Sequence, residues 1–273
     1  MLEDRRNRGR ALGPPPIAPV LYIQGDNLIH RTISAHAWLF DLDGVLTPTA
    51  AVHMRAWAQL FIPYLETAGA EPFTDNDYFA YIDGKPRYDG VRSLLGSRGI
   101  VLPDGSPKDS PEAETICGLG NRKNAVFNDT LALDGVAPYA SSIKFLDAIE
   151  SAGHVAAVVS SSKNARRVLE ASGLAHRFSV VVDGSYAAKE HLAGKPAPDT
   201  YIRAAELLGV PASSCAVIED AESGVQAGAA GTFAIVIGVD RGVGRQALHR
   251  HGAVIVVDEL DELIPSITGK DKA

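Results

Sequence analysis

Two aspartates interrupt an apolar segment in a pattern that suits chemistry. The segment AWLFDLDGVLT spans residues 37–47, and one leucine separates Asp41 from Asp43. Side chains alternate across a β-strand, so positions i and i+2 share a face, and we expect both carboxylates to converge at the end of an apolar strand. Because burying an unpaired charge is costly, the pair points to a site rather than to simple packing.

Further polar residues follow other apolar runs in the second half of the chain. Ser160 follows HVAAVV, Glu219 and Asp220 follow CAVI, and Lys195 lies in the loop AGKPAPD. Ligands of parallel α/β sheets bind beyond the carboxyl ends of the strands. We therefore expect these groups to meet the two aspartates at one rim.

This set of side chains indicates phosphoryl transfer with Mg²⁺ as the cofactor. Several carboxylates in one cleft repel each other unless a cation is present, and Mg²⁺ prefers oxygen ligands while leaving positions for water and phosphate. Lysine and serine donate hydrogen bonds to phosphate oxygens. One carboxylate can attack phosphorus and form an aspartyl phosphate, and a second can move the proton of the hydroxyl.

The segments that position these residues alternate between apolar runs and helical patterns. Continuous β-branched runs separated by helices predict a parallel sheet covered on both faces. Right-handed crossovers then give a doubly wound, Rossmann-like α/β core. Beyond the first strand, the predicted strands are 154–160, 178–184, 214–220, 232–238 and 253–258, and the predicted helices are 164–171, 198–209 and 221–231.

Residues 51–135 break this alternation. They show helical patterns without a convincing strand, and a loop rich in Pro, Asp and Ser at 101–112. An all-helical block placed after the first strand predicts an inserted cap domain. We therefore expect the core to comprise residues 36–50 and 136–273, with an N-terminal extension over 1–35 that is partly flexible.

Composition excludes several functional classes. The chain has 273 residues, 22% of them charged, and its net charge of −7 argues against nucleic acid or anionic membrane as a partner. No apolar run approaches the roughly 18 residues of a membrane span. The Arg- and Pro-rich N-terminus has no signal-peptide core, and the two cysteines suit a reducing compartment. We expect a cytoplasmic protein that is a monomer or a weak dimer.

Four segments together resemble the motifs of the haloacid dehalogenase superfamily. They are DLDGV at 41–45, the strand-end Ser160, GKPAPD at 194–199 and IED at 218–220. The resemblance implies that Asp41 is the nucleophile and that Asp43 is the general acid and base.

The same resemblance implies roles for the remaining motif residues. Ser160 would hold the transferring phosphoryl group, and Lys195 would offset charge on the nucleophile and the phosphate. Asp220, with Glu219 as a weaker candidate, would join the Asp41 side chain and the Asp43 main-chain carbonyl around Mg²⁺. The dehalogenase branch lacks both Mg²⁺ and the acid/base aspartate, so Asp43 argues against that branch.

A closer resemblance is to the β-phosphoglucomutase branch, which interconverts β-glucose 1-phosphate and glucose 6-phosphate through a bisphosphate. DLDGVLTPTAAVHMRAW resembles its opening, SSSKN at 160–164 its phosphate-binding turn, and DGKPRYDG at 83–90 a cap segment. The resemblance implies a small phosphosugar substrate. The implied substrate-binding residues are Thr49, His53, Arg87, Lys123, Ser161, Ser162, Lys163 and Asn164.

Physical reasoning separates a mutase from a phosphatase. A mutase must hold two phosphates at once, so it needs a distal cationic site, which Arg87 and Lys123 could form; arginine offers a planar fork suited to phosphate. It must also keep water from the aspartyl phosphate, which a closing cap can do. Pro48 and Pro86 depart from the branch's pattern in the hinge and in the cap segment.

Other interpretations stay open at this point. The same core would serve a phosphatase that hydrolyses a small phosphosugar, and a catalytically inactive phosphosugar-binding module is a remote possibility. Ser160 to Ser162 could be a helix N-cap run. Glu219 could be a structural neighbour of the site, His53 could simply pack on the first cap helix, and Trp57 fits a core position better than a ligand-binding one.

Overall fold

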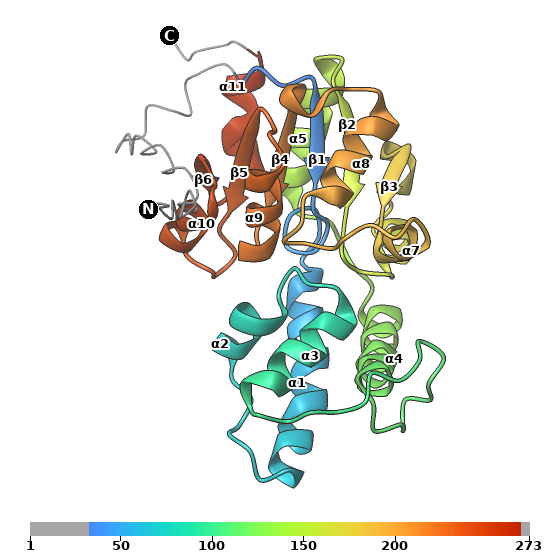
Figure 1. Cartoon of the computed structure of the whole chain (residues 1–273). Coiled ribbons are helices and arrows are strands. Elements are labelled where there is room, and N and C mark those ends of the chain that lie inside the picture. Colours follow the sequence, from blue (N-terminus) through green and yellow to red (C-terminus); the bar gives the residue numbers. More distant parts are fainter. Residues whose placement is uncertain (1–32, 269–273) are drawn as a thin grey trace, which may run out of the picture.

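A parallel sheet of six strands, in the order β3-β2-β1-β4-β5-β6, organises the structure (Figure 1). The computed structural model describes residues 33–268. Every predicted strand is present, and the fold class is confirmed as a doubly wound α/β core. The strands are β1 (Ala37–Phe40), β2 (Val155–Val159), β3 (Val180–Val182), β4 (Cys215–Glu219), β5 (Ile235–Val239) and β6 (Ile255–Val257).

The register of the central strand β1 with its two neighbours determines where the site residues leave the sheet. Phe40 pairs with Val158 of β2 on one side and with Ile218 of β4 on the other. The residues that follow these three positions therefore leave the sheet at nearly the same height. This register brings together motifs that lie more than 100 residues apart in the chain, as parallel crossovers permit.

The first strand is shorter than its apolar run. It ends at Phe40, and a turn follows in which the Leu46 N–H donates to the Leu42 carbonyl at 3.0 Å. The Asp43 N–H donates to Asp41 Oδ2 at 2.8 Å. The explanation by strand alternation is therefore wrong. The two aspartates meet because the chain turns directly after the strand, with Gly44 at a φ of +95° that favours glycine.

Helices cover both faces of the sheet, as the continuous apolar strands require. Trp38 and Phe40 face α5, α6 and α11, while Ala37 and Leu39 face α8, α9 and α10. The sequence predicted α6, α8 and α9 but not the others. The core helices are α5 (Ala140–Ser151), α6 (Ala165–Ala171), α7 (Gly184–Lys189), α8 (Asp199–Leu208), α9 (Glu222–Ala230), α10 (Arg245–His251) and α11 (Ile264–Thr268).

A separate helical block, the cap, lies beyond the carboxyl ends of the strands (Figure 1). It packs around its own apolar cluster, which includes Phe61, Leu65, Leu94 and Leu119, and residues 51–135 contain no strand. Its elements are α1 (Thr49–Thr67), α2 (Asp75–Asp77), a π-helical turn (Tyr78–Ile82), α3 (Arg87–Ser97) and α4 (Ile116–Asp134).

The end of the predicted N-terminal extension packs on the core. Ile33 and Ala35 are buried in the apolar cluster beneath the sheet, and the Ile33 N–H donates to the Ser266 carbonyl at 3.1 Å. Residues 1–32, on which the predicted flexible tail falls, lie outside the described residues. Among residues 33–268, every helix is too short or too polar to cross a membrane.

The packing under β1 predicts a large effect of one core substitution. Phe145 of α5 is fully buried and meets Trp38 and Phe40 edge-to-face, with ring centroids 5.1 and 6.0 Å apart. Phe145→Ala should lower the free energy of unfolding by about 3–5 kcal/mol, measured by urea denaturation. Leu207→Ala on exposed α8 surface is the control, with an expected loss below about 1 kcal/mol. Equal losses in both variants would contradict this account.

Candidate active site

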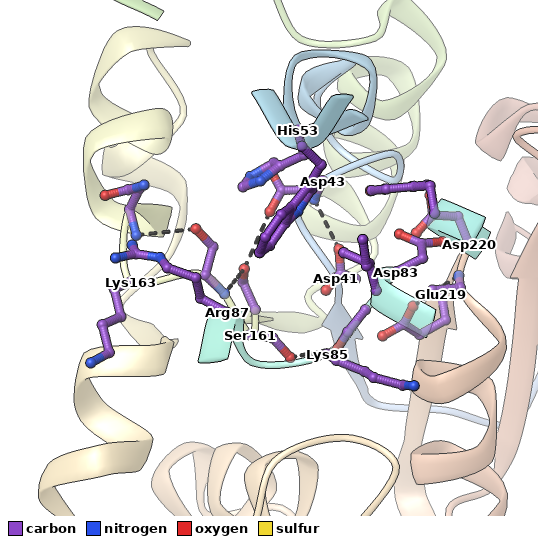
Figure 2. Close-up of a pocket in the computed structure, with 18 of the residues that line it drawn as sticks. Asp41, Asp43, His53, Asp83, Lys85, Arg87, Ser161, Lys163, Glu219 and Asp220 are labelled. Atoms are coloured by element: carbon purple, nitrogen blue, oxygen red, sulfur yellow. Dashed lines mark hydrogen bonds and ion pairs between the residues drawn. The ribbon is translucent and has the colours of Figure 1, made fainter. Parts of the chain in front are cut away.

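The predicted site residues meet in a cleft between the carboxyl edge of the sheet and the cap (Figure 2). All of them line this cleft except Thr49 and Lys195, which contact its aspartates from behind. Arg87 and Lys163 lie on one side of the cleft, and Glu219 and Asp220 lie on the other (Figure 2). The cleft is therefore cationic at one end and anionic at the other.

Asp41 is fixed in place through both carboxylate oxygens. Its Oδ1 accepts a hydrogen bond from Lys195 Nζ at 2.5 Å, and its Oδ2 accepts one from the Asp43 N–H at 2.8 Å. The Lys195 ammonium is almost fully buried and also donates to the Val159 carbonyl at 3.0 Å. The first carboxylate after the central strand therefore has a single orientation.

Lys195 is shared between two carboxylates. Its Nζ also donates to Glu219 Oε1, and the same oxygen accepts from the Tyr201 hydroxyl at 2.7 Å. Glu219 Oε2 accepts from the Ala221 N–H at 3.3 Å. Burial lowers the pKa of Lys195, but Asp41 and Glu219 outweigh burial and hold that pKa well above its usual range. The lysine is a permanent cation, and Glu219 helps to position it.

Asp43 is oriented by the first turn of the cap. Its Oδ1 accepts a hydrogen bond from Thr49 Oγ1 and lies 3.6 Å from His53 Nε2, and its Oδ2 accepts from Ser160 Oγ at 3.4 Å. Burial raises the pKa of Asp43, but His53 and the Thr49 hydroxyl together lower it by more than burial raises it. The net shift of the pKa is therefore downward. Pro48 does not disturb this arrangement, because Thr47 Oγ1 and Thr49 Oγ1 still lie 2.7 Å apart.

Three carboxylates form a cluster able to hold a metal ion. Oxygens of Asp41, Glu219 and Asp220 lie within 4.8 Å of one another, and all three residues are buried. Gly44 packs against this cluster so closely that a Cβ there would lie 1.8 Å from Asp220 Oδ2. Burial first, and then the Asp83 and Asp41 carboxylates, raise the pKa of Asp220 well above its ordinary value. The cluster therefore favours a proton or a cation.

A second cap cation, Lys123, lies beside His53. Lys123 Nζ contacts His53 Nδ1 and lies 4.9 Å from the Trp57 ring centroid. Burial and then Arg87 depress the pKa of Lys123 well below its usual range. Trp57 belongs to the apolar cluster of the cap, as predicted, and it also lines the cleft.

The phosphate-binding turn predicted at 160–164 contacts the cap at two points. Arg87 Nη2 and Asn164 Nδ2 both donate to Asn124 Oδ1, at 2.6 and 2.7 Å, and Ser161 Oγ donates to the Gly84 carbonyl at 2.7 Å. Within the turn, the Ser162 N–H donates to Ser160 Oγ at 3.1 Å. The Ser162 hydroxyl accepts from the Asn164 N–H at 3.1 Å. Both hydroxyls thus accept bonds within the turn, while the N-cap position of α6 is Asn164.

A family model for haloacid dehalogenase-like hydrolases matches residues 36–232 of the chain. The chain belongs to this family. The resemblance drawn from the four motifs is thereby confirmed, and the doubly wound core with its helical cap is the fold expected of a haloacid dehalogenase-like hydrolase.

Individual relatives of this haloacid dehalogenase-like hydrolase are phosphomutases by name. The β-phosphoglucomutase of Mycobacterium bovis is 52% identical over 239 residues, which cover 84% of this chain and 91% of that protein. That of Bacillus subtilis is 30% identical over 232 residues, covering 83% and 91%. A solved β-phosphoglucomutase from Clostridium difficile shares the fold, with a TM-score of 0.67 at 23% identity, covering 84% and 93%.

Sequence reasoning missed several residues of the site. Asp83 and Lys85 line the cleft from the cap segment 83–90, from which only Arg87 was predicted. Asn124 bridges Arg87 and Asn164. The DGK sequence could have marked Asp83 as a carboxylate beside the arginine. No local signal marks Tyr201, which lies in an ordinary amphipathic helix pattern.

Asp83 is a cap carboxylate whose pKa is raised toward neutral pH. Burial is the largest cause that raises the pKa of Asp83 to about 7, with Glu219 and Asp43 adding to it, while the Tyr78 hydroxyl opposes the shift. The Asp83 carboxylate is near enough to Asp220 to raise the pKa of that residue, and both side chains line the cleft. Asp83 therefore adds a fourth carboxylate to the anionic end of the cleft.

This raised pKa predicts a pH-dependent stability in EDTA. The folded state holds a proton on Asp83 up to about pH 7, whereas the unfolded chain loses it near pH 4, so this contribution is full below pH 4 and is lost as pH rises through 7. Between pH 6 and 8, wild type should lose about 1 kcal/mol more unfolding free energy than Asp83→Asn.

Urea denaturation at both pH values measures this difference. Asp129→Asn, which changes an exposed aspartate of α4, is the control and should keep the wild-type slope. Asp83→Asn also removes one cause of the raised pKa of Asp220, so the difference between the two profiles measures Asp83 together with its coupling to Asp220. Parallel pH profiles for wild type and Asp83→Asn would refute the raised pKa.

Proposed function

We propose that the protein is a β-phosphoglucomutase that interconverts β-glucose 1-phosphate and glucose 6-phosphate through an aspartyl phosphate and a bisphosphate. One observation carries the proposal: the cleft has buried carboxylates, among them Asp41 and Asp220, at one end and the cations Arg87 and Lys163 at the other (Figure 2). A phosphatase needs only the first. The 52% identity to a β-phosphoglucomutase supports the same assignment.

In the proposed reaction Asp41 carries the phosphoryl group. Phospho-Asp41 transfers it to the 6-hydroxyl of β-glucose 1-phosphate, and the hydroxyl proton passes to Asp43. The resulting bisphosphate turns around in the cleft. Asp41 then attacks the phosphorus at C1, the bond to the sugar oxygen breaks, and Asp43 returns the proton to that oxygen, which releases glucose 6-phosphate.

The contacts of both aspartates suit these roles. Lys195 and the Asp43 N–H hold Asp41 in one orientation, and the ammonium offsets the charge that accumulates when two anions meet. Thr49 and His53, in the first turns of α1, hold the Asp43 carboxylate in position. Ser160, which contacts Asp43, would donate to the transferring phosphoryl group.

The carboxylate cluster fits Mg²⁺ as the proposed cofactor. Its donors are all oxygens, the class that Mg²⁺ prefers, and burial with mutual repulsion raises the pKa values of Asp41 and Asp220. Asp41, Asp220 and the main-chain carbonyl of Asp43 would hold the ion, with Glu219 as the weaker ligand because Lys195 and Tyr201 already bond to it. When bound, Mg²⁺ would offset the negative charge of carboxylates and phosphate.

The cap cations would bind the distal phosphate. Arg87 of the cap lies beside Lys163 and Asn164 of the core, with the cap residue Asn124 joining Arg87 and Asn164; Ser161 and Ser162 stay predicted substrate-binding residues. Lys123 has a depressed pKa in the structure. A dianionic phosphate beside it would draw a proton onto the amine, so that substrate binding restores its charge.

The alternative is a phosphatase of the same family that hydrolyses a small phosphosugar. The family model describes hydrolases, and the same Asp41 and Asp43 chemistry would serve with water as the acceptor. An inactive phosphosugar-binding module is the remote alternative. A monomer or weak dimer stays the prediction for the assembly.

A coupled assay tests the mutase. Wild type with Mg²⁺, β-glucose 1-phosphate and a glucose 1,6-bisphosphate primer should form glucose 6-phosphate. Asp41→Asn should lose this activity by about three orders of magnitude or more, because it lacks the nucleophile, while Asp129→Asn on exposed α4 surface should keep it. Steady phosphate release without glucose 6-phosphate, even with primer, would reject the mutase in favour of the phosphatase.

A glycine substitution tests the metal site without relying on turnover. Gly44→Ala would place a Cβ 1.8 Å from Asp220 Oδ2 and should displace that carboxylate. We expect Mg²⁺ affinity, measured by calorimetry, to fall about 10–100-fold, the effect of disturbing support for a metal ligand. Gly99→Ala is the matched control: it has a φ of +68° and nothing near its Cβ position. Unchanged affinity in Gly44→Ala would count against this site.

A further inference from the structure

A short cap segment, residues 83–86, makes a contact between cap and core that is separate from the apolar contacts of α1 and α4. It lies between the π-helical turn and α3. Two core serines bind its backbone: Ser223 Oγ donates to the Asp83 carbonyl at 3.0 Å, and Ser161 Oγ donates to the Gly84 carbonyl at 2.7 Å. The cap backbone is thus held by core side chains.

The segment sits against the core without room for additional atoms. A Cβ at Gly84, whose φ is +68°, would lie 2.3 Å from Ser223 Oγ. A Cβ at Gly194 would lie 2.5 Å from Pro86 Cγ. Glycine on each side of the interface permits this close approach, and the two surfaces are closely packed.

The three core positions adjoin three catalytic motifs. Ser161 follows Ser160, Gly194 precedes Lys195, and Ser223 is the second residue of α9, three positions after Asp220. The segment therefore rests on the loops that carry the reactive groups. Closure of the cap at this point depends on all three loops being in place.

The two sides of the cap contact the core differently. At the ends of α1 and α4, Val52, Ala56, Phe127 and Leu131 join the apolar cluster beneath the sheet, which makes a durable connection. At 83–86 the contact includes two hydroxyl-to-carbonyl hydrogen bonds. Water can replace such bonds when they part, so their net contribution is small, as a contact that must open repeatedly requires.

We propose that Ser161 and Ser223 form a latch that closes the cap and thereby decides whether phospho-Asp41 reacts with a sugar hydroxyl or with water. The proposal rests on the proposed function. In the competing reaction a water oxygen attacks phosphorus, the bond from phosphorus to the Asp41 oxygen breaks, Asp43 takes the proton, and phosphate leaves. Both serines are positioning residues, since they hold the cap rather than touch the reacting atoms.

Loss of the latch should shift the products. In the primed assay, Ser223→Ala and Ser161→Ala should each raise the ratio of phosphate released to glucose 6-phosphate formed by about fivefold, the effect expected for one hydrogen bond. The double variant should raise it by about 25-fold if the effects add. Ser161→Thr, which keeps a hydroxyl, should return the ratio toward that of wild type.

A matched control comes from the cap itself. Ser97 Oγ donates to the Leu94 carbonyl at 2.7 Å within the same block, away from the interface. Ser97→Ala removes an equivalent bond and should leave the product ratio unchanged. A ratio that rises equally in Ser97→Ala and Ser223→Ala would overturn the latch, because general loosening of the cap would then explain both.

Hydrogen–deuterium exchange provides a readout that needs no substrate. A peptide spanning 78–90 should exchange faster in the double variant than in wild type or Ser97→Ala, while peptides from β1 and β4 stay unchanged. Unchanged exchange at 78–90, or faster exchange throughout the chain, would overturn the latch. If wild type forms no glucose 6-phosphate, the proposed function fails, and this measurement alone then upholds or rejects closure by the two serines.

Discussion

The burial of several carboxylates in one cleft is the constraint on which the rest of the structure depends. Lys195 makes this burial possible by contacting Asp41 and Glu219 together, since a buried charge without a partner would cost several kcal/mol. Tyr201 and the Ala221 N–H complete the bonds of Glu219. With Lys195 and the Asp43 N–H occupied in this way, Asp41 points into the cleft in one orientation, which an attacking carboxylate needs.

The cap completes the charge balance from the other side. Arg87 and Lys123 lie on the cap side of a cleft whose core end is anionic, and burial lowers the pKa values of both, so an anion bound beside them would favour their charged forms. The charge at each end of the cleft is uncompensated: the carboxylates favour a cation, and the cap cations favour an anion. A metal ion together with a bisphosphate would satisfy both ends at once, and this is the physical reason why the mutase is the better description than a one-phosphate hydrolase.

Closure of the cap links this chemistry to its specificity. Substrate binding by Ser161 stays a prediction, and in the structure its hydroxyl donates to the Gly84 carbonyl of the cap. Ser223, which no motif marked, makes the companion bond. A mutase and a phosphatase of one family share the nucleophile and the acid/base, so the difference between them lies in water access, which weak contacts of this kind can set.

The sequence by itself indicated the succession of strands, the helices α6, α8 and α9, a helical block after the first strand and the candidate residues Asp41, Asp43, Ser160, Lys195 and Asp220, because apolar periodicity and short motifs are local properties of the chain. It placed the two aspartates together for the wrong reason, since a turn after Phe40 and not strand alternation joins them. Only the tertiary structure decided that Glu219 supports Lys195, that Tyr201 and Asp83 belong to the site, and that Ser161 and Ser223 meet the cap. These contacts join residues from 18 to 140 positions apart, and their geometry follows from the register of parallel strands and the docking of the cap, which no local pattern encodes.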